Sequence, residues 1–247
     1  GGVRVSAEAI APRVGGHPGR PMPAHRRVGH AHSTEARPEP REARLKKSML
    51  SLVIPTYRER ENLEPLLERL ALVRAALGEP LEVLVVDSGS EDGTAACART
   101  LLARLQLGRL IESPRDQDLA RAVMNGVRHA AGDLIGVMDA DLSHPPELLP
   151  ALSAAVREGS DVAVASRYVH GGGAAHWPRS RRLLSQVGNR LARPLVPVAD
   201  ATSGYFGCRA SLVRGLAVHP RGFKILLELL VRGNVRRARE IPYVFTD

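Results

Sequence analysis

Cysteine is scarce in this 247-residue chain, and long apolar runs are missing from it. The two cysteines, Cys97 and Cys208, stand in neither a CxxC pair nor a histidine framework, which excludes a disulfide-built fold and a zinc ribbon. We expect both to be reduced thiols of a cytosolic protein. A membrane-spanning helix needs about 18 consecutive apolar residues, whereas the best candidate, ILLELLV at 225–231, is short and interrupted by Glu228. The sequence therefore predicts a chain that does not cross a membrane by itself.

Two glycine-rich phosphate-binding signatures are also absent. No GxGxxG opens an expected helix and no GxxxxGK[ST] occurs, so dinucleotide-binding and P-loop proteins lose their main sequence signal. Aromatic residues make up only 3% of the chain, which leaves few rings on which the bases of a single-stranded nucleic acid could stack. With 44% hydrophobic and 25% charged residues, the composition is instead typical of one sizeable α/β domain.

The formal charge of +9 is concentrated at one end of the chain. Residues 1–48 carry 10 Lys and Arg against 4 Asp and Glu, which leaves a net charge of only +3 for residues 49–247. Residues 1–48 are rich in Pro, Gly, Arg and His without apolar periodicity, so we predict a disordered basic tail followed by one folded domain at 49–247. The alternative is an arm that binds anionic lipid or nucleic acid. We expect no specific nucleic-acid partner.

From residue 49 onward, short β-branched runs alternate with stretches of helical period. Strands are expected at 50–55, 81–87, 108–113, 134–139 and 161–166, with helices at 63–77, 94–105, 119–131 and 146–158 between them. Thr94 is the expected N-cap of the second helix. This alternation predicts an α/β fold with a mostly parallel sheet that helices cover on both faces.

Three segments follow expected strands directly, at 55–59, 87–90 and 139–143. The carboxyl ends of parallel strands meet at one edge of the sheet, and ligands bind there. Asp139 and Asp141 are two residues apart, so in an extended segment both carboxylates point to the same side. Carboxylates bind a phosphate only through a cation, and an oxygen-only donor set suits Mg²⁺ or Mn²⁺. His144 behind them is assigned to a turn, although a metal ligand is the alternative.

Several ordered motifs resemble one enzyme family. These are VIPTYRERENL, LVVDSGSEDGT, VMDADLSHPPELLP, DVAVASRYVHGGG and DATSGYFGCR, followed by GFKILLELLVRG and EIPYVF. Together they resemble the polyprenyl- or dolichyl-phosphate mannosyltransferases of the bacterial branch. These are inverting family 2 glycosyltransferases with a GT-A fold, which is Rossmann-like, and the resemblance spans residues 49–247.

The resemblance implies a role for each matching residue. A nucleotide-sugar donor is expected to contact Pro55, Tyr57, Glu59, Asp87, Ala140 and Asp141. The cation is expected at Asp139, Asp141 and Ser143, where many relatives have Gln at the third position. The phosphate of a polyprenyl-phosphate acceptor is expected at Arg167, Arg181 and Ser185, and Asp141 and Arg181 are the expected catalytic residues.

The implied reaction moves mannose from GDP-mannose to a polyprenyl phosphate at the cytosolic face of a membrane, with the protein bound peripherally. The acceptor phosphate is largely dianionic at neutral pH, so no protein general base is required. Arginines at 167–193 suit such an anionic acceptor. Three alternatives stay open: a UDP-glucose donor, a catalytically silent nucleotide-sugar binding module, and a basic nucleic-acid-binding protein.

The chain departs from the family pattern in three places. Ser88 stands where relatives commonly have a second acid, and Asp118 stands where a glycine-rich turn is expected, which brings a negative charge toward the diphosphate. Relatives also continue past the position of Asp247, so we expect the domain to lack their usual C-terminal end. The segment HGGGAAHWP at 170–178 is either a mobile loop over the site or a plain linker, and Trp177 in it either inserts at a lipid interface or packs on the domain.

Overall fold

The structure is a computed structural model that describes residues 48–115, 118–175, 179–216 and 224–246. The side chains at positions 179, 181–183 and 186 are outside this description. Residues 1–47 of the predicted tail also fall outside it, and so does Trp177. The disorder expected for the tail and the two roles considered for Trp177 therefore stay predictions.

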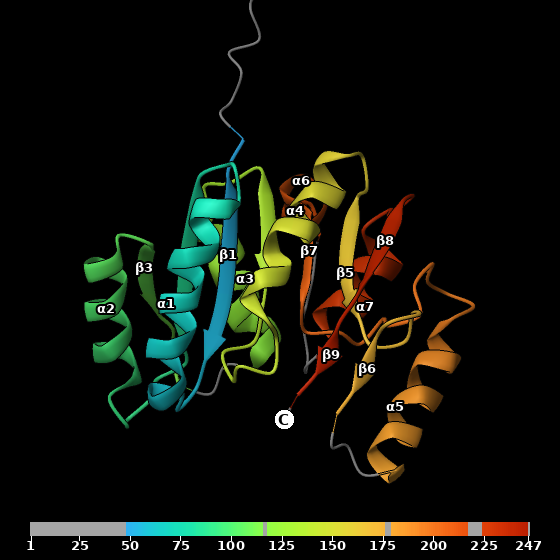
Figure 1. Cartoon of the computed structure of the whole chain (residues 1–247), viewed down its shortest axis with the longest axis horizontal. Coiled ribbons are helices and arrows are strands. Elements are labelled where there is room, and N and C mark those ends of the chain that lie inside the picture. The colour runs from blue at the N-terminus through green and yellow to red at the C-terminus, as the bar shows by residue number, and fades with distance from the viewer. Residues whose placement is uncertain (1–47, 116–117, 176–178, 217–223, 247) are drawn as a thin grey trace, which may run out of the picture. The chain divides into compact units, whose positions relative to one another are not determined.

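Helices and strands alternate along the domain as the periodicity predicts (Figure 1). The first part of the chain contains β1 (Leu50–Thr56), α1 (Arg60–Ala76), β2 (Leu81–Asp87), α2 (Thr94–Leu105), β3 (Gly108–Glu112), α3 (Leu119–His129) and β4 (Leu134–Val137). Then come a 3₁₀ turn η1 (Pro146–Leu148), α4 (Leu149–Arg157), β5 (Val162–Ser166), β6 (Gly173–Ala174), α5 (Arg179–Ala192), β7 (Phe206–Arg209), α6 (Ala210–Arg214), α7 (Ile225–Arg232), β8 (Ala238–Pro242) and β9 (Val244–Phe245).

Seven strands form one sheet in the order β3-β2-β1-β4-β7-β5-β8. The pairs β1–β2, β1–β4, β2–β3 and β5–β8 are parallel, which confirms the predicted mostly parallel sheet. The exception is β7, which was not predicted and which runs antiparallel between β4 and β5. The short strands β6 and β9 pair with each other in a second, two-stranded sheet.

Helices cover both faces of the seven-stranded sheet, as predicted. Leu52 and Ile54 of β1 pack with buried side chains of α1, α2 and α4, whereas Val53 points to the opposite face and packs with those of α3, α6 and α7. Because both faces are covered, the strands read as nearly continuous apolar runs. Among the described residues, no helix combines the length and apolar character needed to cross a bilayer.

Two local predictions about helix starts need correction. The N-cap of α2 is Gly93 and not Thr94. Gly93 has a φ of 90°, a backbone conformation that only glycine adopts readily. Thr94 is the first helical residue, and its buried hydroxyl accepts a hydrogen bond from the Glu59 amide at 3.0 Å. The helix expected at 146–158 opens as the 3₁₀ turn η1 before α4 begins.

Candidate functional site

The loops after β1, β2 and β4 enclose a pocket of about 500 Å³ at the carboxyl ends of these strands. The prediction that the three segments meet at one edge is therefore confirmed. Six predicted site residues line the pocket: Pro55, Tyr57, Glu59, Asp139, Ala140 and Asp141. Six further lining residues were not predicted to contact a ligand: Thr56, Ser88, Arg115, Asp118, Leu119 and Ala122.

The acid pair sits on a tight loop whose geometry is held by hydrogen bonds. Asp141 Oδ1 accepts from the backbone N of Ser143 at 3.0 Å and from its hydroxyl at 2.5 Å. Leu142 between them has a φ of 62°, which closes the turn. The Ser143 side chain is buried and directed at Asp141, and it is not part of the pocket lining. Its expected direct contact with a cation stays a prediction, while its observed contact orients Asp141.

Negative charge accumulates around Asp139. Burial, together with the charges of Asp141 and Glu59, raises the pKa of this carboxyl to about 6, against the opposing effect of Arg167. An oxygen-rich cluster with excess negative charge suits a hard divalent cation. Among the described residues, no three His, Cys, Asp or Glu side chains converge on a metal site. Mg²⁺ is commonly bound by one or two carboxylates together with substrate phosphates and water, and the Asp139–Asp141 pair fits that pattern.

His144 lies beneath the acid pair in the loop that follows β4. Its ring is buried, and the ring centroids of Tyr205, Tyr243 and Phe245 lie 5.3, 5.8 and 5.9 Å away. This burial lowers the pKa of His144 to about 4, so the ring is neutral near pH 7. Its Nδ1 then accepts a hydrogen bond from the Asp139 amide at 3.3 Å. His144 thus supports the backbone that carries the first acid of the pair.

The rim of the pocket combines an exposed ring with charged side chains. Tyr57 is 50% exposed, and the Arg58 guanidinium lies 5.3 Å from its ring centroid. Across the pocket, Asp118 caps α3 by accepting from the Arg121 amide at 2.9 Å. Asp118 lines the pocket, and its predicted proximity to a diphosphate stays a prediction. The positive end of the α3 dipole partly offsets its charge.

Asp87 lies just behind the pocket wall. It is buried and accepts from the Thr56 hydroxyl at 3.1 Å, the Ser90 amide at 2.9 Å and the Ser90 hydroxyl at 2.6 Å. These contacts tie the end of β2 to the end of β1. The neighbouring Ser88 lines the pocket instead. The predicted contact of Asp87 with base or ribose is not tested by this geometry.

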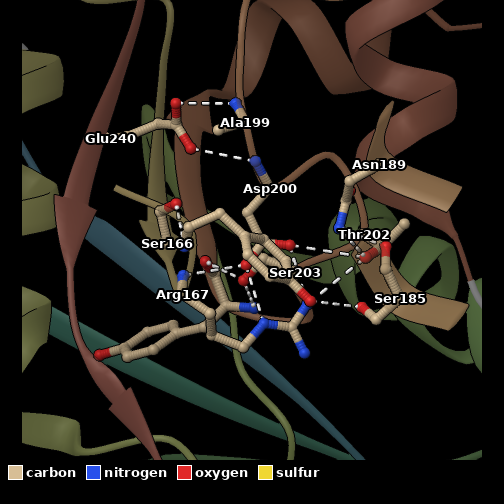
Figure 2. A network of polar contacts seen from close by, with 11 residues as sticks. Ser166, Arg167, Ser185, Asn189, Ala199, Asp200, Thr202, Ser203 and Glu240 are labelled. Atoms are coloured by element: carbon tan, nitrogen blue, oxygen red, sulfur yellow. Dashed lines mark hydrogen bonds and ion pairs between the residues drawn. The ribbon is translucent and has the colours of Figure 1, made fainter. Parts of the chain in front are cut away.

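The predicted acceptor residues fall in the loop after β5 and on α5. Arg167 follows β5 and forms an ion pair with Asp200, with 2.8 Å between Nη2 and Oδ1 (Figure 2). Ser185 on α5 accepts a hydrogen bond from the Tyr168 hydroxyl at 2.7 Å. Arg181 belongs to α5, but its side chain is among those outside the description. The structure therefore brings Arg167 and Ser185 into one polar network without testing their roles.

A covered α/β sheet with an acidic ligand pocket at its carboxyl edge defines the broad class of this protein. Residues 51–216 match the model of the family described as glycosyl transferase family 2. The chain belongs to this family.

Curated relatives share much of the domain. A dolichol-phosphate mannosyltransferase of Pyrococcus furiosus is 40% identical over 200 residues, which cover 79% of this chain and 56% of that protein. A polyprenol monophosphomannose synthase of Mycolicibacterium smegmatis is 36% identical, with 79% and 77% covered. The chain thus spans little more than half the length of the archaeal relative.

Solved structures resemble the fold. Glucosyl-3-phosphoglycerate synthase from Mycobacterium tuberculosis, in complex with Mn²⁺, UDP-glucose and glycerol 3-phosphate, has a TM-score of 0.62 and 18% identity, covering 80% of this chain and 71% of that one. This likeness agrees with the GT-A fold that the motifs imply.

Residues brought in by long-range contacts were missed by the sequence analysis. Arg115 reaches the pocket after β3 and pairs with Glu91 at 2.5 Å, yet no motif marks it. Asp200 stands in the quoted DATSGYFGCR motif, but its partner Arg167 lies 33 residues away in sequence. The sequence gives one hint of this ion pair, because Arg167 and Asp200 each belong to one of the quoted motifs.

Proposed function

We propose that this chain is the catalytic domain of a polyprenyl-phosphate mannosyltransferase that uses GDP-mannose. The main support is the acid pair Asp139 and Asp141 in a pocket beside Arg167, in a chain similar to relatives described as dolichol-phosphate mannosyltransferases. In this proposal residues 49–247 form the catalytic domain and residues 1–48 a tail outside it.

In the proposed reaction, an oxygen of the acceptor phosphate attacks the anomeric carbon of mannose with inversion. The bond from that carbon to the donor diphosphate breaks, and GDP leaves with the electron pair. A divalent cation held by Asp139 and Asp141 would stabilise the departing diphosphate as a Lewis acid. Ser143 orients Asp141 toward it. The acceptor arrives as a dianion, so no side chain needs to remove a proton.

The remaining residues bind and position the two substrates in this proposal. The nucleotide sugar contacts Pro55, Tyr57, Glu59, Asp87, Ala140 and Asp141, with Asp87 at the base or ribose. Arg167, Arg181 and Ser185 hold the acceptor phosphate, with Arg181 stabilising the negative charge near the reacting oxygen. Planar guanidinium groups suit phosphate oxygens because they donate paired hydrogen bonds.

We also propose that α5 lies on the cytosolic surface of a membrane. Four apolar side chains at helical spacing are strongly exposed along and just after this helix: Leu184, Val187, Leu191 and Leu195. Residues 179–199 contain five arginines and no acid. An exposed apolar stripe beside positive charge suits the interface of a membrane with anionic lipids. That placement would also bring the acceptor residues of α5 to the lipid.

The test is transfer of labelled sugar into organic-extractable lipid, with GDP-mannose and UDP-glucose compared in the presence of Mn²⁺ or EDTA. We expect EDTA-sensitive transfer from GDP-mannose, which Asp141→Asn abolishes without lowering the melting temperature. Glu112→Gln, at an exposed carboxylate on β3, is the matched control and should keep full activity. Transfer from UDP-glucose alone would mean that the donor is UDP-glucose and not GDP-mannose. Nucleotide binding without any transfer would favour a silent binding module.

A further inference from the structure

The guanidinium of Arg167 is held in one orientation by a buried carboxylate. Its Nε and Nη2 each donate to Asp200 at 2.8 Å, and its backbone N donates to the same carboxylate at 3.0 Å. Asp200 has no exposed surface. The rings of Tyr168 and Phe245 lie 5.6 and 5.8 Å from the guanidinium carbon. Arg167 is therefore fixed in direction as well as in charge.

The segment that carries Asp200 is itself anchored to the edge of the sheet. Glu240 on β8 accepts from the Ala199 amide at 2.8 Å and from the Asp200 amide at 3.1 Å (Figure 2). These two bonds tie the approach to β7 to a strand that is distant in the sequence. The position of Asp200 thus depends on the seven-stranded sheet.

The hydroxyl of Thr202 lies on the side of the network that includes Ser185 and Asn189 (Figure 2). It accepts from Arg167 Nη2 at 3.4 Å and from Asn189 Nδ2 at 3.3 Å, and it lies 3.5 Å from Asp200 Oδ1, to which it donates. One side chain therefore contacts the guanidinium, its counter-ion and helix α5.

Asn189 extends this contact along α5. Its Nδ2 also donates to the Ser185 carbonyl at 3.2 Å, so both of its hydrogen bonds come from the amide nitrogen, while its Oδ1 is buried without a partner in the described structure. A flipped amide would lose the bond to the Ser185 carbonyl, which can only accept. Of the α5 side chains that the structure describes, only Asn189 and Ala192 are buried. Among the described side chains of α5, Asn189 thus provides a buried polar link between the helix and the rest of the domain.

We propose that Thr202 is a positioning residue that couples Arg167 to α5, so that the two halves of the acceptor-phosphate site keep a fixed separation. This inference rests on the proposed function, because it assigns Arg167 and Ser185 to one phosphate. Groups from two elements can grip the same anion only while their spacing is held, and small displacements are costly for transfer. Thr202 touches neither substrate in this arrangement and acts through Arg167 and Asn189.

The experiment compares Thr202→Val, which keeps the shape and removes the hydroxyl, with Thr202→Ser, which keeps the hydroxyl. Steady-state kinetics use the full chain, GDP-mannose and a short-chain polyprenyl phosphate in detergent. We expect Thr202→Val to raise the KM for the lipid phosphate about tenfold, the effect of roughly one lost hydrogen bond. The KM for GDP-mannose should stay unchanged, and Thr202→Ser should behave as wild type.

Two further variants keep the test decisive. Asn189→Leu breaks the same link from the α5 side, so it should reproduce the selective rise in acceptor KM if Thr202→Val fails to fold. Thr100→Val, at an exposed threonine of α2, is the matched control and should change neither KM. The inference is wrong if folded Thr202→Val or Asn189→Leu leaves the acceptor KM unchanged, or if both KM values rise equally. Either result would leave the proposed function intact. A wild-type chain that transfers no mannose to lipid phosphate would overturn the proposed function and this inference together.

Discussion

Gly204 lies directly against the carboxylate of Asp139. A Cβ at this glycine would be 2.3 Å from Asp139 Oδ2, closer than real side-chain carbons approach, and 3.1 Å from its Cγ. The first acid of the pair is therefore packed against backbone that arrives from the segment before β7. Only a residue without a side chain leaves room for this carboxylate.

Gly204→Ala should displace Asp139 and weaken cation binding. Residues that support a metal ligand typically contribute about 10- to 100-fold in affinity, and we expect a loss of that order for Mn²⁺. Titration calorimetry with Mn²⁺ and a nucleoside diphosphate measures it. Gly207→Ala is the control, because its Cβ would meet nothing closer than 3.9 Å. Wild-type affinity in Gly204→Ala would contradict the idea that this contact positions the carboxylate.

The raised pKa of Asp139 predicts a pH-dependent stability. Its pKa of about 6 lies above the ordinary 3.8, so the fold favours the protonated form. Stability from this group is fully present below about pH 4 and is lost as the pH rises through about 6. Without a cation, Asp139→Asn should therefore melt higher than wild type near neutral pH, by about 2–4 °C for each kcal/mol of charge repulsion removed. The difference should vanish below about pH 4.

Comparing wild type with Asp139→Asn separates the effect of Asp139 on stability from that of His144. The lowered pKa of His144 acts in the opposite direction, because a histidine kept neutral in the fold costs stability as the pH falls from about 6.5 to about 4. His144 Nδ1 lies 3.6 Å from Asp139 Oδ2, so the two proteins are compared above about pH 7, where the ring is neutral in the folded and the unfolded state. Added Mn²⁺ should raise the melting temperature of wild type and not of Asp139→Asn. Equal melting curves near neutral pH would argue against the charge cluster.

The exposed stripe of α5 should govern binding to lipid vesicles. Leu184 and Leu191 are 75% and 74% exposed, so replacing both with Gln should leave the melting temperature unchanged. Loss of two apolar side chains from an interface should reduce co-sedimentation with anionic vesicles about tenfold or more. Leu72→Gln, at a leucine of α1 that is 76% exposed, is the matched control. Equal vesicle binding by all three proteins would remove α5 from the membrane surface.

The two cysteines should differ sharply in reactivity. Cys208 is completely buried, and this raises the pKa of its thiol to about 12, whereas Cys97 is partly exposed. Since the thiolate is the reactive form, a thiol reagent should modify Cys97 in the native protein and Cys208 only after unfolding. Labelling followed by mass spectrometry distinguishes them, and Cys97→Ser should abolish native-state labelling. Rapid native labelling of Cys208 would mean that the β7 region opens readily.

Local patterns account for what could be predicted. Strands β1 to β5 and the helices between them follow from short apolar runs and helical periodicity, both of which depend on neighbouring residues. The edge rule for parallel sheets then places Tyr57, Glu59 and the acid pair in one pocket before any contact is known. These elements and pocket residues can be predicted without knowing which residues distant in the sequence they contact.

Long-range packing accounts for what could not be predicted. The strand β7 reads FGCR, in which a glycine and an arginine interrupt the apolar run that marks the other strands. Its antiparallel place between β4 and β5 depends on which strands remain unpaired. The contacts of Gly204 with Asp139 and of Asp200 with Arg167 follow from that place. Thr94 illustrates a smaller limit, because two adjacent residues could cap α2 and the backbone conformation favours the glycine.

The position of β7 also determines the order in which the domain can assemble during synthesis. Strands β1 to β4 pair with one another, whereas β5 joins the sheet only through β7 and β8, which are made later. A nascent chain that has emerged only as far as β5 can build the β3-β2-β1-β4 half, but one edge of β4 still awaits its partner. Asp200 and Gly204 lie in the segment of the sequence that leads into β7. The insertion that closes the sheet is therefore the same event that completes the support for Asp139 and Arg167, so an unfinished chain cannot present a finished site.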